Sequence, residues 1–370
     1  MPLNKKKVLF TSHTANFQKF NRPFMRMLRE QGYEVHYASM GEEQIEDCDK
    51  QFVVPFTRSP FTLSNVRAYR QLKQIIDHEQ YDLIHTHTPV GGVVTRLAAR
   101  QARQRGTRVI YTAHGFHFFT GAPLLNWLVY YPIERLMAHY TDVLITINAE
   151  DYARANRHFA TSVVYVPGVG VDPGRFIPKL TTGEKHALRR SLGLKQSDFV
   201  MVYLAELSKR KNQLWLLAAL RPLLEANTEV HLLLAGQDSL HGQIERYLAR
   251  YCLAGHVHLL GYRNDVHQLL QIADLSISSS KQEGLPVHLM EAMFAGLPII
   301  TTRCRGTTEL VKDNKNGFVT NFDKQVFLQR VEQIRRDPKL AHRLGEQSRL
   351  QARQYDLATI SRTMKEIYNG

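Results

Sequence analysis

The chain has 370 residues, of which 44% are hydrophobic and 22% are charged. This composition is ordinary for a folded globular protein and excludes disordered, collagen-like and coiled-coil chains, while the length predicts two or three domains. Lysine and arginine exceed aspartate and glutamate by 48 − 34 = 14, which favours anionic partners such as nucleic acid, phosphorylated ligands or an anionic membrane face. The three cysteines are odd in number, so we expect reduced thiols, as in a cytoplasm.

Short β-rich runs alternate with helical patterns in the first half of the chain. The predicted strands cover residues 8–11, 34–38, 52–54, 83–85, 109–112, 143–147 and 163–166. Between two of these strands, Val66, Tyr69, Leu72 and Ile76 recur at spacings of three and four, which predicts one buried helical face. Alternation of this kind predicts parallel strands joined by helical crossovers.

A turn-rich segment, Pro167–Gly174, contains two prolines and three glycines and predicts a domain boundary. The alternation then restarts, with predicted strands over residues 199–204, 230–235, 257–260, 275–278, 299–302 and 318–320. We predict two doubly wound α/β domains, residues 1–172 and 173–354. We expect them to face each other across a cleft and to bind ligands where the carboxyl ends of the strands open into it.

The segment from Glu283 to Pro298 is the most informative part of the sequence. Pro286 suits the first turn of a helix and Gly296 suits its end. The amino terminus of that helix would present free N–H groups and a positive dipole end, which suit a diphosphate. Carboxylates at Glu283 and Glu291 are better suited to accept hydrogen bonds from sugar or ribose hydroxyls. The alternative is that the first is a helix cap and the second a solvated helix residue.

This segment resembles the donor-site motif of the retaining glycosyltransferases of family 4. Two glutamates are separated by seven residues, with Gly-Leu-Pro after the first and Ala-Gly-Leu-Pro-Ile close behind the second. The resemblance spans nearly the whole chain and implies the GT-B fold, α/β with two Rossmann-like domains. It also implies that residues 355–370 form a helix that returns to the first domain, and that a sugar is transferred from a nucleotide-sugar without a metal ion or other cofactor.

The resemblance also implies roles for individual residues. Glu283 is expected beside the hydroxyls of the donor sugar, and Glu291 is expected against the ribose. The residues that follow the first glutamate are assigned to donor binding: Gly284, Leu285, Pro286 and Val287.

A second match lies in the loop 204–212, where family members carry an arginine and, a few residues on, a lysine that clamp the diphosphate. Lys211 matches the lysine, but Glu206 occupies the usual arginine position, so Arg210 or Lys209 is expected to supply the second cation. Cations at this place stabilise the charge that grows on the leaving diphosphate. The alternative is a solvated basic loop.

His114 ends a predicted strand in the segment Tyr-Thr-Ala-His-Gly, which resembles the family segment whose histidine approaches the donor sugar. His114 and Glu283 are therefore the candidate catalytic residues. The rival interpretation is a zinc or iron site of a hydrolase, formed by His85, His87 and His114, although no carboxylate lies nearby in the sequence. Asp47-Cys48-Asp49 has the spacing of a metal–diphosphate motif, but it precedes a strand instead of following one, and we discount it.

Basic residues gather beside an apolar and aromatic segment, residues 123–132. The arginines are Arg96, Arg100, Arg103, Arg105 and Arg108. This arrangement favours peripheral attachment to an anionic membrane leaflet, and the alternative is a solvated helix face beside core residues. No recognised nucleic-acid-binding module is visible, so we expect no nucleic-acid partner.

We therefore predict a metal-independent, retaining hexosyl- or N-acetylhexosaminyl-transferase at the cytoplasmic face of the cell membrane. The resemblance of the loop 205–213 to that of polysaccharide-synthesis members implies a UDP-sugar donor. It also implies a polyprenyl-linked acceptor in the synthesis of a capsule or exopolysaccharide. The alternatives are a UDP-sugar 2-epimerase of similar fold, a glycosyltransferase with a soluble acceptor, and a basic nucleic-acid-binding protein with a degenerate sugar site.

Overall fold

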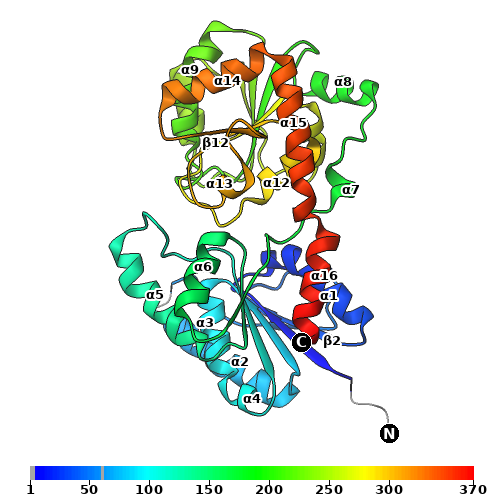
Figure 1. The fold of residues 1–370 in the computed structure, drawn as a ribbon, viewed down its shortest axis with the longest axis vertical. Helices are drawn as coiled ribbons and strands as arrows, with labels where there is room; N and C mark the ends of the chain where they lie inside the picture. The colour runs from blue at the N-terminus through cyan, green and yellow to red at the C-terminus, as the bar shows by residue number, and fades with distance from the viewer. Residues whose placement is uncertain (1–4, 60–61) are drawn as a thin grey trace. The chain divides into compact units, whose positions relative to one another are not determined.

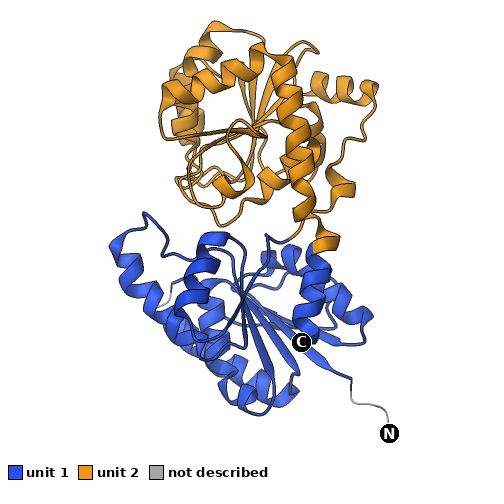
Figure 2. Cartoon of the chain, viewed as in Figure 1, with its two compact units in different colours: residues 1–169, 360–370 blue, residues 170–359 orange. Residues whose placement is uncertain are grey.

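The computed structural model describes residues 5–59 and 62–370, which divide into two compact units (Figure 1 and Figure 2). Unit 1 contains residues 1–169 and 360–370, and unit 2 contains residues 170–359. The boundary after Val169 lies inside the turn-rich segment of the sequence. Each unit has a parallel sheet with helices, which confirms the predicted α/β class with two Rossmann-like domains.

In the described part of unit 1, seven parallel strands form one sheet in the order β3-β2-β1-β4-β5-β6-β7. The strands are β1 Lys7–Thr11, β2 Glu34–Ser39, β3 Lys50–Val53, β4 Leu83–His87, β5 Arg108–Ala113, β6 Val143–Thr146 and β7 Ser162–Tyr165. All seven were predicted from the sequence to within two residues at either end, because each contains apolar or β-branched residues in a short segment between helical patterns.

Helices cover the sheet of unit 1. They are α1 Gln18–Glu30, α2 Leu63–Glu79, α3 Pro89–Ala98, α4 Arg100–Gln104, α5 Leu124–Ala138, α6 Ala149–His158 and the greater part of α16 Leu357–Asn369. The predicted buried face of α2 is wrong at Val66, which is 46% exposed. Leu72 and Ile76 are buried as predicted, Tyr69 is partly buried against the same core, and Ala68 takes the buried position of the turn that contains Val66.

The end of the chain is part of the core of unit 1. Ile360, Met364, Ile367 and Tyr368 of α16 are buried, and they belong to the same hydrophobic cluster as Phe24 of α1. These positions recur at spacings of four, three and one, so one face of the helix is apolar. The core of unit 1 therefore includes residues that follow unit 2 in the sequence.

In unit 2, the described residues form six parallel strands in the order β10-β9-β8-β11-β12-β13. The strands are β8 Phe199–Leu204, β9 Val230–Ala235, β10 Val257–Leu259, β11 Leu275–Ser278, β12 Ile299–Thr302 and β13 Gly317–Thr320. The helices are α7 Pro173–Phe176, α8 Thr182–Ser191, α9 Gln213–Ala226, α10 Gln243–Arg250, α11 Val266–Ile272, α12 Val287–Ala295, α13 Thr307–Leu310, α14 Lys324–Arg336 and α15 Pro338–Ala352.

Both sheets contain a point where the strand order reverses. In unit 1 this point lies between β1 and β4, and in unit 2 it lies between β8 and β11. Doubly wound sheets bind ligands at the carboxyl ends of the strands that flank such a point, because the connecting helices there diverge to opposite faces of the sheet. The loops after β8 and β11 position the candidate residues of unit 2, and in unit 1 the candidate residue follows β5, the neighbour of β4.

Candidate functional site

Two loops of unit 2 bring a buried ion pair to the carboxyl end of its sheet. Lys211 follows β8, and Glu283 follows the neighbouring strand β11. Nζ of Lys211 donates to Oε1 of Glu283 at 2.5 Å, and the two residues are 8% and 6% exposed. Nη1 of Arg210 donates to Oε2 of the same carboxylate at 3.2 Å. The structure thus brings together three of the residues that the sequence assigns to donor binding.

Charges around Glu283 keep its carboxylate ionised. Burial alone would raise the pKa of Glu283, but the neighbouring cations Lys211 and Arg210 hold it below its ordinary value. Nε of Arg305 also donates to the backbone carbonyl of Glu283 at 3.1 Å. Two cationic side chains therefore contact the carboxylate of Glu283 and a third contacts its backbone, and the surplus positive charge favours an anionic ligand.

Helix α12 begins directly beside this cluster. Pro286 is its N-cap residue with φ −74°, and Gly296 ends it in the left-handed region with φ 78°. Pro286 thus precedes the first turn instead of occupying it as predicted, and Val287 is the first helical residue. The first-turn N–H groups and the positive end of the helix dipole are suited to an anion. A Cβ atom at Gly306 would lie 2.2 Å from the carbonyl oxygen of Gly284, so the loop after β12 packs tightly on the approach to the helix.

The remaining predicted donor-site residues occupy distinct places. Leu285 is buried in the approach to α12, and Glu291 is half-buried in the second turn of that helix. Glu206, at the usual arginine position, accepts a hydrogen bond from the hydroxyl of Ser239 at 2.5 Å. Its carboxylate is therefore engaged in a contact within unit 2. Of the two candidate second cations, Arg210 contacts Glu283 beside Lys211, whereas Lys209 is exposed.

The sequence did not indicate two further side chains of this cluster. The hydroxyl of Tyr203 donates to the backbone carbonyl of Lys211 at 3.0 Å and lies 2.8 Å from the hydroxyl of Ser280. His288 is buried beside Tyr203, and its Nε2 has no hydrogen-bond partner among the described residues. In the sequence, only the position of His288 between the two glutamates of the motif could have indicated it. Tyr203 resembles any other buried strand residue.

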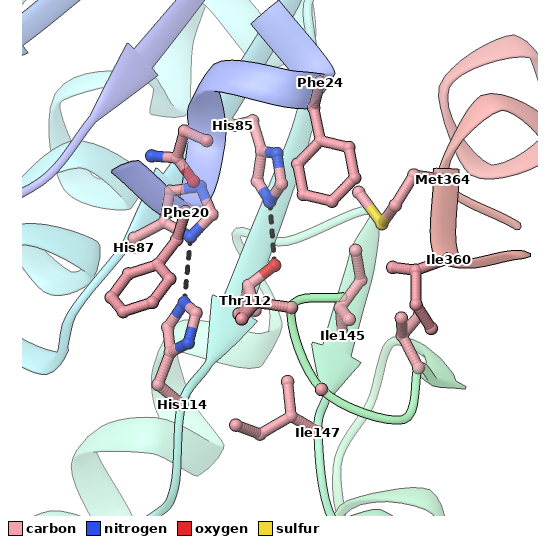
Figure 3. A pocket seen from close by; sticks show the side chains of 14 residues that line it. Phe20, Phe24, His85, His87, Thr112, His114, Ile145, Ile147, Ile360 and Met364 are labelled. Carbon is pink, nitrogen blue, oxygen red and sulfur yellow. Dashed lines mark hydrogen bonds between the residues drawn. The ribbon is translucent and has the colours of Figure 1, made fainter. Parts of the chain in front are cut away.

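In unit 1, His114 directly follows β5 and is half-buried at the carboxyl end of the sheet. Figure 3 shows its ring beside that of His87, the last residue of β4. Nε2 of His114 is 3.1 Å from Nδ1 of His87. A small cavity of about 20 Å³ lies against both rings and is lined also by Phe20 of α1 and Met364 of α16.

Burial keeps these histidines neutral. It lowers the pKa of His114 to about 4 and that of His85 to about 3. His85 uses both ring nitrogens, since Nδ1 is 2.8 Å from the hydroxyl of Tyr368 and Nε2 is 2.8 Å from the hydroxyl of Thr112. At neutral pH these rings therefore act as hydrogen-bonding groups and carry no charge.

Neither metal-binding alternative is supported by the geometry. Both nitrogens of His85 have partners other than His87 and His114, and no group of three histidines, cysteines or carboxylates within the described ranges could hold a metal ion. Asp47 accepts hydrogen bonds from Arg22 at 2.8 Å and Arg26 at 2.9 Å, so it has a structural role on the surface of unit 1.

The predicted basic surface differs from the observed one. Arg96 is 1% exposed, donates to Glu134 at 2.9 Å and lies over the ring of Tyr111, so its prediction as a surface cation is wrong. Arg103 and Arg105 each pair with an aspartate, at 2.8 Å and 2.7 Å. These aspartates, Asp142 and Asp77, are distant in sequence from the arginines, so the charge pattern near the arginines could not predict the ion pairs.

Helix α5 exposes an apolar strip. Leu124, Leu125 and Leu128 are 80%, 68% and 73% exposed, and Leu136 further along the helix is 55% exposed. Arg135 on the same helix is also exposed. None of the helices in residues 5–59 and 62–370 is long and apolar enough to cross a bilayer.

Comparison with known proteins gives consistent matches over both units. Residues 7–148 match the family model described as glycosyl transferase 4-like, and residues 184–351 match that of glycosyl transferases group 1. EpsD of Bacillus subtilis (strain 168), which is named as a glycosyltransferase, is 41% identical over 99% of this chain and 97% of its own length. The UDP-Gal:α-D-GlcNAc-diphosphoundecaprenol α-1,3-galactosyltransferase of Escherichia coli is 29% identical over 75% of this chain and 72% of its own.

Among solved structures, Anabaena Alr3699/HepE in complex with UDP-glucose superposes with a TM-score of 0.80. It is 21% identical in sequence, and the match covers 98% of this chain and 99% of that one. This likeness confirms the GT-B fold.

Proposed function

The chain belongs to the glycosyltransferases that these two family models describe, and from this premise we propose that it transfers a sugar from a UDP-sugar with retention of anomeric configuration. The observation that carries the proposal is the buried Lys211–Glu283 pair at the amino terminus of α12. The lysine and the helix N-terminus suit the diphosphate of a nucleotide-sugar, and the carboxylate suits the hydroxyls of its sugar.

Each group of unit 2 has a role in the proposed reaction. Lys211, Arg210 and the first turn of α12 hold the diphosphate and stabilise its charge as it leaves. Glu283, already held by Lys211, accepts hydrogen bonds from hydroxyls of the donor sugar. Glu291 accepts hydrogen bonds from the ribose. These cationic and dipolar groups do the work that a metal ion does in other transferases, so we propose that transfer is metal-independent.

His114 of unit 1 is proposed to contact the transferred sugar. It lies at the carboxyl end of β5, which neighbours β4, is half-buried, and has one ring nitrogen held by His87. Because its pKa of about 4 leaves it neutral, it serves as a hydrogen-bonding group and not as an electrostatic stabiliser. The transferred group is proposed to be a hexose or an N-acetylhexosamine.

The proposed acceptor is a polyprenyl-diphosphate-linked sugar in surface polysaccharide synthesis. The Escherichia coli relative is named for a diphosphoundecaprenol-linked acceptor, which supports this class. A lipid-linked acceptor requires the enzyme to work at a membrane. The exposed leucines of α5 near Arg135 offer a surface for peripheral attachment to an anionic cytoplasmic leaflet.

A thermal-shift screen of the purified chain against UDP-, GDP- and ADP-sugars tests the donor proposal. We expect UDP-sugars to raise the melting temperature in the wild type and to do so much less in Glu291→Ala, since ligands that bind only the native state stabilise it. A response confined to GDP- or ADP-sugars would contradict the UDP assignment. Product analysis separates transfer from the epimerase alternative, because an epimerase would return a UDP-linked 2-epimer.

A further inference from the structure

A second histidine lies behind the candidate catalytic one. β4 and β5 are parallel neighbours with His87 opposite Thr112, so the ends of the two strands bring His87 and His114 together. His87 is 2% exposed, whereas His114 is half-buried. The ring of Phe17 packs edge-on against His114 with centroids 4.7 Å apart, and the ring of His85 lies 4.2 Å from that of His87. Both imidazoles are therefore held in place by packing.

The positions of the ring N–H hydrogens of His87 and His114 can be inferred from their surroundings. Burial lowers the pKa of both histidines, so each ring is neutral and carries one N–H hydrogen. The contact between Nδ1 of His87 and Nε2 of His114 needs one nitrogen with a hydrogen and one without. Nε2 of His87 is buried and has no partner among the described residues. A buried N–H without an acceptor is rarer in proteins than an under-used acceptor, so the hydrogen of His87 belongs on Nδ1.

We propose that His87 is a positioning residue that holds His114 in the Nδ1–H tautomer. Nδ1 of His87 donates to Nε2 of His114, which leaves the single hydrogen of His114 on its own Nδ1. His114 then offers a neutral N–H donor, and not a lone pair, to a substrate oxygen. The tautomer stands on the geometry of unit 1 alone, whereas the substrate contact rests on the proposed function.

Nuclear magnetic resonance of the full chain, labelled with ¹⁵N-histidine, reads the tautomer directly. His114 is assigned by the signal that disappears in His114→Gln. We expect the pattern of an Nδ1–H tautomer for His114 in the wild type. In His87→Phe we expect a shift toward the Nε2–H form, and in His87→Asn, whose amide can replace the Nδ1–H donor, we expect the wild-type pattern. If His114 in the wild-type protein is in the Nε2–H form, the proposal is wrong, whatever the variants show.

Kinetics then separate positioning from a general structural role. His87→Phe should lower kcat by about a hundredfold, the lower end of the range of about 10²–10³ for losing one oriented donor, while the KM for the donor changes little. His87→Asn should recover most of the rate. The double variant His87→Phe/His114→Ala should be no slower than His114→Ala alone, because His87 acts through His114. Additive losses would contradict the proposal. Absence of turnover with every donor would defeat the proposed function, while the tautomer measurement would still decide the role of His87.

Discussion

Nζ of Lys211 and Oε1 of Glu283 lie 2.5 Å apart, and both residues are more than nine-tenths buried. Each charge is stabilised mainly by the other, since little water reaches either. The pair is therefore a structural element of unit 2 as well as a candidate part of the donor site. Variants that remove one of the charges must be compared with variants that remove both.

Lys211→Met should lower the free energy of unfolding by about 3–5 kcal/mol, because it leaves the carboxylate of Glu283 buried without its main partner. The double variant Lys211→Met/Glu283→Gln should lose much less, since no unpaired charge remains. Urea denaturation measures both. Lys209→Met, at an exposed position of the same loop, is the matched control and should change stability by about 0.5 kcal/mol or less. Equal losses in the single and double variants would show that the pair is not coupled.

Glu291→Ala should weaken UDP binding by about one to two orders of magnitude, since hydrogen bonds to a charged group contribute about 1.5–3 kcal/mol. Isothermal titration calorimetry with UDP measures the change. Circular dichroism should show an intact fold, because Glu291 is only half-buried. If UDP binds the variant as tightly as the wild type, the ribose assignment is wrong.

Stability should fall between pH 7 and pH 5. Burial lowers the pKa of His85 and of His288 to about 3, well below the ordinary value of 6.5. The stabilisation is complete above pH 6.5 and is lost as the pH falls toward 3, because the unfolded chain binds protons that the native state does not. Each histidine should contribute up to about 1.4 kcal/mol per pH unit. Denaturation at the two pH values measures the change in the free energy of unfolding. His85→Asn should reduce the slope, and equal stabilities at both pH values would contradict the prediction.

Replacement of Leu124, Leu125 and Leu128 by serine should release the protein from vesicles that contain anionic phospholipid. These side chains lose the apolar area that could enter a membrane interface, and little folded-state packing is lost because all three are at least 68% exposed. Flotation with vesicles measures binding, and hydrolysis of the donor should be unchanged. Binding should also weaken as salt increases, because salt screens surface charges. If the variant still binds the vesicles and salt does not weaken the binding, the membrane contact does not lie on α5.

Local patterns were sufficient to predict the strands and the end of α12, and they placed its start within one residue, because each depends on a run of neighbouring residues. Gly296 illustrates this, since its left-handed φ of 78° is a feature that glycine adopts without strain. The contacts that organise the sites join residues that are distant in sequence. Tyr368 is hydrogen-bonded to His85, which is 283 residues away in the sequence, and Arg96 is hydrogen-bonded to Glu134, which is 38 residues away. Hydrophobic periodicity carries no information about such pairs, which is why Arg96 was predicted at the surface. His87 and His114 were grouped from the sequence only as alternative metal ligands, and their direct contact was not predicted.

The central claim is tested most directly by incubating the purified chain with UDP-sugars and a polyprenyl-diphosphate-linked sugar acceptor, with and without EDTA. We predict release of UDP, a glycosylated acceptor whose new linkage keeps the anomeric configuration of the donor, no loss of rate with EDTA, and a large loss of rate in Glu283→Gln. Formation of a UDP-linked 2-epimer, an inverted linkage, or full loss of activity with EDTA that manganese restores would contradict the mechanism proposed for this site.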